Sequence, residues 1–303
     1  MTVAVGLIGC GTWGKLILRD LVSLGARVHV VVRETLAEKL SASGAASVNV
    51  DPASIPEPVD GYIVATPTST HAAVIEQLLP TGKPIFVEKP LTDDLPSARR
   101  LAVLAGDRIF VMDKWRYHPG VEALRDQARS GALGEIRAVR TFRVGWGTSH
   151  RDVDPIWTLL PHDLSIAYEI LGTLPVAHSA WSLPPRPTGL VARLSDGGEG
   201  PEVVAEVSTS YPQTRRSVVV IGDRGAAELA DSYADRILVS LGPAGGPIRQ
   251  PDAVPISTAM PLRREVEAFL GYLRGGPAPR STAAEGLLVV ERIVALRAMA
   301  GLA

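Results

Sequence analysis

The first third of the chain alternates short apolar runs with segments whose apolar residues recur at helical spacing. Apolar runs occupy residues 3–8, 26–32, 61–65 and 108–113, with shorter ones at 47–50 and before residue 88. Runs of this length without polar alternation are typical of parallel strands buried on both faces. The pattern therefore predicts an α/β fold with an N-terminal Rossmann-type doubly wound parallel sheet.

From residue 136 the pattern changes to strict alternation of apolar and polar residues. It predicts strands with one solvated face, and hence a C-terminal α+β domain with a largely antiparallel open sheet, at residues 136–145, 203–210, 216–221, 226–229 and 237–241. Two closing helices, at 262–274 and 283–299, have apolar faces that we interpret as core packing, and we expect 242–255 to be a loop. We place the boundary near residue 115, which gives domains 1–115 and 116–303.

A glycine motif follows the first strand directly. The motif is Gly9-x-Gly11-x-x-Gly14, with Thr12 and Trp13 inside it, and a helical pattern comes next. Strand, glycine turn and helix in this order form a dinucleotide fingerprint: the first glycine makes the tight turn, the second admits the pyrophosphate and the third lets the helix pack on the strand. The helix N-terminus then offers its N–H groups to phosphate.

The end of the second strand bears on the choice of coenzyme. NAD-dependent versions of the motif carry an acidic residue here for the ribose 2'-hydroxyl. In this chain Val32 or Arg33 takes that position, and Glu34 comes one residue later. A guanidinium suits a 2'-phosphate, so we favour NADP, with NAD as the alternative.

Two later strands end in polar side chains that we expect at the same sheet edge, where ligands of open parallel sheets lie. The first leads into Thr66, Pro67, Thr68 and His71, with Thr68 or Ser69 able to cap the next helix; His71 alone would be read as a solvated first-turn histidine. The other strand ends in Glu88-Lys89-Pro90. Because Pro90 restricts Lys89 to an extended backbone, the chain leaves the sheet there and Lys89 points to the ligand edge.

Composition narrows the possible partners. The formal net charge of -1 gives no electrostatic reason to expect nucleic acid or an anionic membrane. Cys10 is the single cysteine, which excludes an intramolecular disulfide and a cysteine metal cluster, and we interpret it as a small residue in the glycine turn. No signal-like segment or long apolar run occurs, so we expect a cytoplasmic protein without a metal.

A helix that Asp154 caps and Pro155 begins carries the polar residues of the second domain. Thr158 and His162 share one helix face, and Pro161 lies between them. Candidate substrate-binding residues are Arg116, Trp146, Arg151, Asp154, Trp157 and Thr158. Tryptophans can stack on a sugar or base and Arg151 can hold a phosphate; alternatively, the tryptophans are core residues and the arginines are solvated.

Taken together, these motifs resemble the glucose-fructose oxidoreductase and inositol dehydrogenase family. The resemblance rests on the ordered set G-C-G-T-W-G at 9–14, A-T-P-x-x-x-H at 65–71, V-E-K-P at 87–90, Y-H-P at 117–119, G-A-L-G-E-I at 131–136, the helical His162, V-I-G-D-R-G at 220–225 and P-L-R-R-E-V-E-A-F-L at 261–270. It covers nearly the whole chain. The segment at 157–166 looks most like branches that act on nucleotide-linked sugars.

The resemblance implies a pyridine-nucleotide oxidoreductase that moves a hydride between nicotinamide and a hydroxyl- or ketone-bearing carbon of a sugar, sugar nucleotide or cyclitol. It implies that Lys89 and His162 are the catalytic pair, that they converge on the coenzyme, and that the protein forms a homodimer or homotetramer. Many members carry aspartate where this chain has Thr158. Threonine cannot stabilise an imidazolium by charge, so His162 is expected to be a weaker base unless Asp154 or Asp163 substitutes, and we favour the ketoreductase direction. Reduction of a non-sugar carbonyl or imine, and coenzyme sensing without turnover, remain alternatives.

Overall fold

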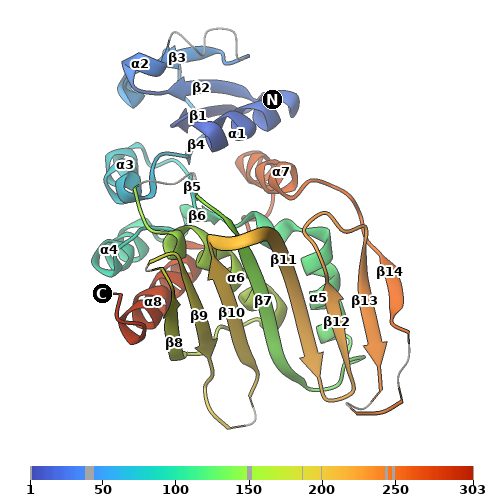
Figure 1. Ribbon diagram of the computed structural model, residues 1–303. Helices are drawn as coiled ribbons and strands as arrows, with labels where there is room; N and C mark the ends of the chain where they lie inside the picture. Colours follow the sequence, from blue (N-terminus) through green and yellow to red (C-terminus); the bar gives the residue numbers. More distant parts are fainter. Residues whose placement is uncertain are drawn as a thin grey trace. The chain divides into compact units, whose positions relative to one another are not determined.

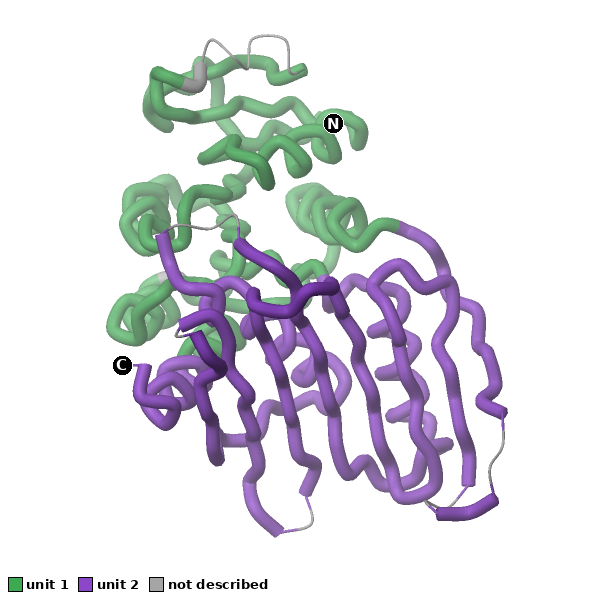
Figure 2. The backbone as a smooth tube through the Cα atoms, in the orientation of Figure 1, with its two compact units in different colours: residues 1–114, 260–290 green, residues 115–259, 291–303 purple. Residues whose placement is uncertain are grey.

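The computed structural model describes residues 2–37, 44–148, 152–185, 187–198, 200–242, 245–247 and 250–302. The chain divides into two compact units, coloured separately in Figure 2: unit 1 is residues 1–114 with 260–290, and unit 2 is residues 115–259 with 291–303. The first division lies beside the boundary expected near residue 115. The expected domain 116–303 differs from the structure in its last part, because residues 260–290 return to unit 1.

Unit 1 contains the predicted doubly wound sheet. Six parallel strands run in the order β3-β2-β1-β4-β5-β6, with bounds β1 (Ala4–Ile8), β2 (Arg27–Val31), β3 (Ser47–Asn49), β4 (Gly61–Val64), β5 (Ile85–Glu88) and β6 (Ile109–Met112). The helices between them are α1 (Thr12–Ser23), α2 (Glu34–Ala37), α3 (His71–Leu78) and α4 (Leu95–Ala105). Figure 1 shows these elements in the blue and cyan part of the chain.

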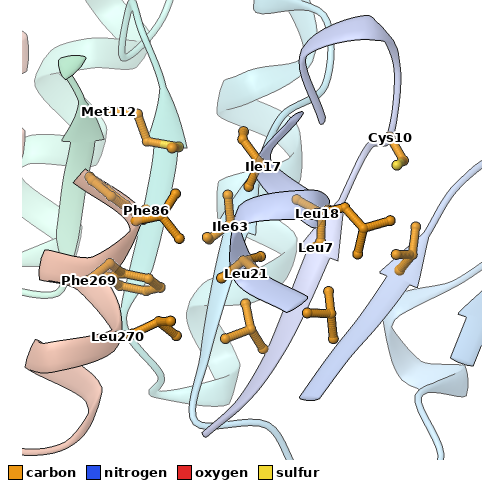
Figure 3. Close-up of a cluster of buried hydrophobic side chains, with 14 of the residues drawn as sticks. Leu7, Cys10, Ile17, Leu18, Leu21, Ile63, Phe86, Met112, Phe269 and Leu270 are labelled. Atoms are coloured by element: carbon orange, nitrogen blue, oxygen red, sulfur yellow. The ribbon is translucent and has the colours of Figure 1, made fainter. Parts of the chain in front are cut away.

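The core of unit 1 joins the N-terminal strands to a helix from near the C-terminus. The apolar stripe of α7 (Pro261–Leu273) contributes Leu262, Val266, Phe269 and Leu270 to the cluster around α1 and the sheet. Figure 3 shows Phe269 and Leu270 on the side of Phe86 and Met112, with the α1 residues beyond them. The Phe86 and Phe269 ring centroids are 4.9 Å apart. This buried stripe explains why residues 260–290 belong to unit 1, since exposing it would cost the hydrophobic free energy of several large side chains.

Unit 2 is a mostly antiparallel eight-stranded sheet with helices α5 (Pro119–Arg129) and α6 (Pro155–Leu171). The strand order is β14-β13-β12-β11-β7-β10-β9-β8, and only the β7 and β10 pair is parallel. The strand bounds are β7 (Ile136–Trp146), β8 (Ala177–Leu183), β9 (Gly189–Leu194), β10 (Glu202–Ser208), β11 (Ser210–Gly222), β12 (Gly225–Leu229), β13 (Arg236–Leu241) and β14 (Asp252–Pro255). The last helix, α8 (Ala283–Met299), is divided between the two units.

Three strands and one helix cap differ from the sequence-based expectations. β8 and β9 were not predicted, and β14 lies inside the segment expected to be a loop. β14 is an edge strand with mostly exposed side chains, so it lacks the apolar alternation on which strand prediction rests. Thr68 and Ser69 do not cap α3: they belong to a 3-10 turn (Thr68–Thr70), and the N-cap residue Thr70 makes no side-chain hydrogen bond to the first turn of α3.

Helix α6 begins as predicted. The Asp154 carboxylate accepts a hydrogen bond from the Ile156 N–H at 3.0 Å, and Gly172 ends the helix with a left-handed φ of 75°. Pro161 lies inside the helix. Among the described helices, none has both the length and the apolar character that a bilayer span requires.

We expect Phe269→Ala to lower the free energy of unfolding by about 3–5 kcal/mol, because it opens a cavity between α7 and the sheet. The cost depends on how far Leu273 and Phe86 can close that cavity. Urea denaturation measures the change. Val103→Ala is the control: Val103 is 83% exposed, so its truncation should alter the free energy by no more than about 0.5 kcal/mol. Equal effects of the two substitutions would show that α7 is not part of this core.

Candidate active site

The glycine turn between β1 and α1 has the geometry that its sequence predicts. Gly9 has a φ of +90°, and a Cβ there would lie 2.6 Å from the Ala65 carbonyl oxygen. A Cβ on Gly14 would lie 2.6 Å from the Gly9 carbonyl oxygen. Neither position can therefore carry a side chain. At Gly9 both the positive φ and the packing against Ala65 exclude one, and at Gly14 the close approach of the helix to the end of the strand does.

Gly11 differs from its two neighbours, because a Cβ there would meet no atom within 4 Å. Gly11 and Thr12 are exposed at the start of α1, whose N-cap has no side-chain hydrogen bond and whose first turn carries no acidic residue. Within the first turn itself, therefore, no capping or acidic side chain satisfies these N–H groups or the positive end of the helix dipole. These residues fit the pyrophosphate of a dinucleotide.

A hydrogen bond and a cation–π contact connect Trp13 to the ends of β5 and β6. Its indole Nε1 donates to the Glu88 Oε1, and the Lys114 Nζ lies 4.1 Å from the centroid of its ring. Burial raises the pKa of Glu88 to about 6, and the opposing influences of Lys89, Lys114 and the Trp13 hydrogen bond are smaller. Glu88 and Trp13, both predicted to bind the coenzyme, are therefore bonded to each other beside the glycine turn.

Sequence reasoning missed an acidic residue on α7. Glu265 is 1% exposed and lies one turn before Phe269, which packs on Phe86 in β5. Neither of its carboxylate oxygens has a hydrogen-bond partner among the residues that the structure describes. Burial raises its pKa well above the ordinary value, and the charges of Glu88 and Asp113 add to the rise. The sequence did carry a signal: Glu265 interrupts the apolar stripe of α7 at helical spacing.

A second acid and lysine pair also went unnoticed. Asp113 and Lys114 follow β6 as Glu88 and Lys89 end β5, and the two strands are paired in parallel with Glu88 opposite Met112. Both lysines therefore leave the sheet at its carboxyl edge. The Lys89–Pro90 peptide bond is cis. In the described part of the chain, no group of three or more acidic, histidine or cysteine residues is arranged to hold a metal ion.

The remaining residues predicted to bind the coenzyme lie after β2 and β4. Val32 is buried, so Arg33 is the first exposed side chain beyond β2, and Glu34 begins α2. After β4, Pro67 is exposed, Thr68 is buried, and the Thr66 hydroxyl accepts a hydrogen bond from the Thr70 hydroxyl at 2.9 Å. His71 is 1% exposed, not solvated as its position alone suggested.

In unit 2, α6 carries His162, which is half-buried, next to an acidic residue that points into the sheet. The Asp163 carboxylate accepts a hydrogen bond from the Arg143 Nε at 2.8 Å, and both side chains are buried. Burial raises the pKa of Asp163, and Arg143 opposes the rise. The Arg143 guanidinium in turn lies 4.4 Å from the Trp115 ring. This buried pair fixes α6 to β7 and therefore the helix that presents His162.

Two polar residues near the start of α6 are bonded within unit 2. The Thr158 hydroxyl donates to the Pro155 carbonyl at 3.0 Å, and Thr158 is buried. The Asp154 carboxylate accepts from the Ile156 N–H and from the Arg297 guanidinium. Thr158 thus makes a bond that a threonine makes within many helices, and Asp154 has a structural role at the helix N-terminus.

The other predicted substrate-binding residues have different surroundings. Arg116 is 8% exposed and donates to the Glu169 carboxylate at 2.8 Å, so it is neither solvated nor facing open space. Trp157 is buried with the Arg297 guanidinium 5.5 Å from its ring centroid, which agrees with the core alternative. Trp146 is 77% exposed and keeps a ring face available for stacking. Arg151 lies outside the described residues.

We expect the stability of the protein to fall as pH rises through the pKa of Glu88. Between its ordinary pKa of 4.5 and about 6, the folded chain keeps a proton that the unfolded chain has released. The contribution is therefore fully present below about 4.5 and is lost above about 6. Glu88→Gln stays neutral and can still accept from Trp13, so its free energy of unfolding should decline less across this window in urea denaturation.

The control for this prediction is Glu267→Gln, which removes a carboxylate from the exposed side of α7. Its pH dependence should follow that of the unsubstituted protein. If Glu88→Gln followed the same curve as Glu267→Gln between pH values of about 4.5 and 6, the protonation of Glu88 in the folded state would be disproved.

Comparison with known proteins agrees with this geometry. The family described as an oxidoreductase family with an NAD-binding Rossmann fold matches residues 3–109. The myo-inositol dehydrogenase Hyg17 of Streptomyces leeuwenhoekii is 36% identical over 149 residues, 46% of this chain and 45% of that protein. A UDP-N-acetylglucosamine 3-dehydrogenase of Acidithiobacillus ferrooxidans is 36% identical over 121 residues, 39% of this chain and 38% of that protein. These two alignments span less than half of each relative.

A solved structure extends the similarity along the chain. A crystal structure from Magnetospirillum magnetotacticum MS-1 is 27% identical, covers 98% of this chain and 100% of its own, and has a TM-score of 0.83. The sequence resemblance drawn from the ordered motifs is therefore confirmed. Residues 3–109 of this chain match the oxidoreductase family with an NAD-binding Rossmann fold, and proteins named inositol dehydrogenase are among its relatives.

Proposed function

We propose that this protein transfers a hydride between a nicotinamide coenzyme and a hydroxyl- or ketone-bearing carbon of a sugar, sugar nucleotide or cyclitol. The names of the relatives support these substrate classes. The observation that carries the proposal is the position of Lys89, which leaves β5 at the same sheet edge as the glycine turn. Ligands of open parallel sheets bind at that edge.

The coenzyme would supply or receive the hydride. Gly9, Gly11, Thr12 and Gly14 form the turn that accommodates its pyrophosphate, and the α1 N–H groups bind the phosphate charge. The hydrogen bond between Trp13 and Glu88 holds these two side chains beside the glycine turn. Thr66, Pro67 and Thr68 follow the neighbouring strand β4 and line the groove.

Lys89 carries the electrostatic part of the proposed chemistry. When hydride reaches a carbonyl carbon, negative charge develops on the oxygen, and an ammonium directed at that oxygen stabilises the transition state. Glu88 is the acidic residue next to Lys89 in sequence, and its carboxylate accepts a hydrogen bond from Trp13 beside the glycine turn. Lys89 is partly buried, which strengthens its electrostatic effect relative to that of a solvated lysine.

His162 supplies the proton in this proposal. A histidine has an ordinary pKa near neutrality, so it can donate to an alkoxide and accept from a hydroxyl. The Asp163–Arg143 pair holds its helix against β7. Thr158 donates its hydroxyl to Pro155 and adds no negative charge, so we favour carbonyl reduction, in which the histidine starts as the proton donor.

A coenzyme sensor without turnover is the second candidate, favoured by the same threonine. Incubation with NADPH or NADH and a panel of keto-sugars, keto-cyclitols and nucleotide-linked keto-sugars separates the two. Oxidation of NADPH by at least one panel member supports the oxidoreductase. The panel is extended by simple non-sugar ketones and imines. If both coenzymes bind and no compound of the extended panel is reduced, the result supports the sensor function and contradicts catalysis.

Within unit 2, the eight-stranded sheet exposes Trp181 and Tyr211, which are 53% and 36% exposed. Such aromatic residues are common at protein interfaces. We therefore propose that this sheet mediates a homodimer or homotetramer.

We expect Lys89→Ala to lower kcat by about 10²–10³-fold while the affinity for NADPH changes little. The loss follows from removing the charge that stabilises the developing alkoxide, an interaction stronger in the transition state than in the bound coenzyme. Single-substrate kinetics with the most active panel compound and titration calorimetry with NADPH measure the two effects. Lys83→Ala, which removes an exposed lysine just before β5, should retain the original kcat. Equal turnover in Lys89→Ala would refute the assignment.

We expect Arg33→Ala to weaken NADPH binding more than NADH binding, by about 10-fold or more. Arg33 is the first exposed side chain after β2, where the coenzyme ribose binds in this fold, and a guanidinium binds a 2'-phosphate by charge and hydrogen bonds. Fluorescence titration with each coenzyme measures the ratio. Arg27→Ala, at the other end of β2, should leave the ratio unchanged. A uniform loss for both coenzymes in Arg33→Ala would contradict the preference for NADP.

A further inference from the structure

His71 connects the ends of two neighbouring strands of unit 1. Its Nδ1 lies 2.9 Å from the Pro90 carbonyl oxygen and its Nε2 lies 3.1 Å from the Thr66 carbonyl oxygen. The side chain is 1% exposed. Thr66 follows β4, and Pro90 follows Lys89 at the end of β5. The ring therefore spans the segment after β4, proposed to bind the coenzyme, and the segment that contains the proposed catalytic Lys89.

The hydrogen-bond capacity of the ring limits what it can do there. Both neighbouring atoms are carbonyl oxygens, which only accept hydrogen bonds. A neutral imidazole has one N–H, so it can donate to one of these oxygens while its other nitrogen faces the second with a lone pair. An imidazolium would donate to both. A proton on Nδ1 matches the shorter of the two distances, whereas the other tautomer would donate to the Thr66 carbonyl.

The surroundings of the ring keep it neutral at physiological pH. Burial lowers the pKa of His71; the two carbonyl oxygens oppose this effect. Two charged residues also act on the ring: Lys89 lowers its pKa further and Asp93 raises it. Lys89 and Asp93 lie on either side of Pro90 in sequence. The segment to which His71 is hydrogen-bonded therefore also carries the two charged residues that shift the pKa of His71.

We propose that His71 is a positioning residue, whose Nδ1–H holds the Pro90 carbonyl and thereby fixes the Lys89–Pro90 turn against the end of β4. The proposal rests on the proposed catalytic role of Lys89, but its geometry lies wholly within unit 1. The hydrogen bond sets where Lys89 leaves the sheet. The coenzyme groove at Thr66 and the lysine ammonium then keep a fixed spacing, as a preorganised site requires.

Two measurements test the bond without turnover. Long-range ¹H–¹⁵N NMR of the folded, unliganded protein identifies the protonated ring nitrogen, and we expect the Nδ1–H form near neutral pH. Brief labelling with acetic anhydride, followed by mass spectrometry, reports the reactivity of Lys89 relative to that of Lys83. In His71→Leu, release of the Lys89–Pro90 turn should change this reactivity ratio by about fivefold, which corresponds to the net free energy of one lost hydrogen bond.

The control is a second histidine, His29, which is buried to the same extent as His71. His29 is also 1% exposed in unit 1, and its Nδ1 lies 2.9 Å from the Ser47 hydroxyl between β2 and β3. His29→Leu therefore removes a buried histidine bond at a site that does not involve Pro90. It should leave the Lys89 labelling ratio and kcat unchanged. His71→Gln, whose amide can donate one hydrogen bond, should restore part of the ratio if it folds.

In activity assays, His71→Leu should lower kcat more than it raises the KM for NADPH. Equal labelling ratios and equal kcat values in His71→Leu and His29→Leu would assign His71 a structural role only. An Nε2–H tautomer would overturn the bond to Pro90. If the unsubstituted protein shows no turnover, the oxidoreductase proposal fails, while the tautomer and the labelling ratio still decide whether His71 fixes the turn.

Discussion

The hydrogen bond between the Trp13 indole and the Glu88 carboxylate joins the two functional halves of unit 1. Trp13 lies in the first turn of α1, which follows the glycine turn, and Glu88 ends the strand that leads into Lys89. A shift of β5 relative to β1 would therefore break this bond and move Lys89 relative to the phosphate-binding turn. The parallel register of β1, β4 and β5 supports the same alignment across the sheet.

Helix α7 completes this arrangement from the far end of the sequence. Gly61 provides the space for it, since a Cβ there would lie 2.8 Å from a Leu273 side-chain carbon and 3.1 Å from the Phe269 ring. The same helix buries Glu265 on the face of the sheet that carries Phe86 and Glu88. A helix expected only to pack a core thus also sets the electrostatic surroundings of Glu88, which ends the strand that leads into Lys89.

Features that depend on residues close together in sequence could be predicted from the sequence. Features that depend on packing between distant residues could not. The glycine turn, the parallel strands and the Asp154 cap follow from residue types at fixed spacing, and each is present. The burial of His71 depends on Pro90, 19 residues away, and the unit that α7 joins depends on Phe86. Arg116 resembled a substrate ligand in sequence, yet Glu169, 53 residues later, binds it. None of these three pairings has a local signature in the sequence.

The charge balance beside the glycine turn follows from burial more than from composition. Glu88, Asp113 and Glu265 would place three negative charges near a turn that must attract phosphate, and Coulomb repulsion would then oppose coenzyme binding. Burial raises the pKa values of Glu88 and Glu265, which favours their neutral forms. Lys89 and Lys114 at the carboxyl edge of β5 and β6 then face less negative charge from Glu265, and Glu88 adds its negative charge once the pH exceeds about 6. Burial of Glu265 in this way weakens one source of repulsion against an anionic coenzyme.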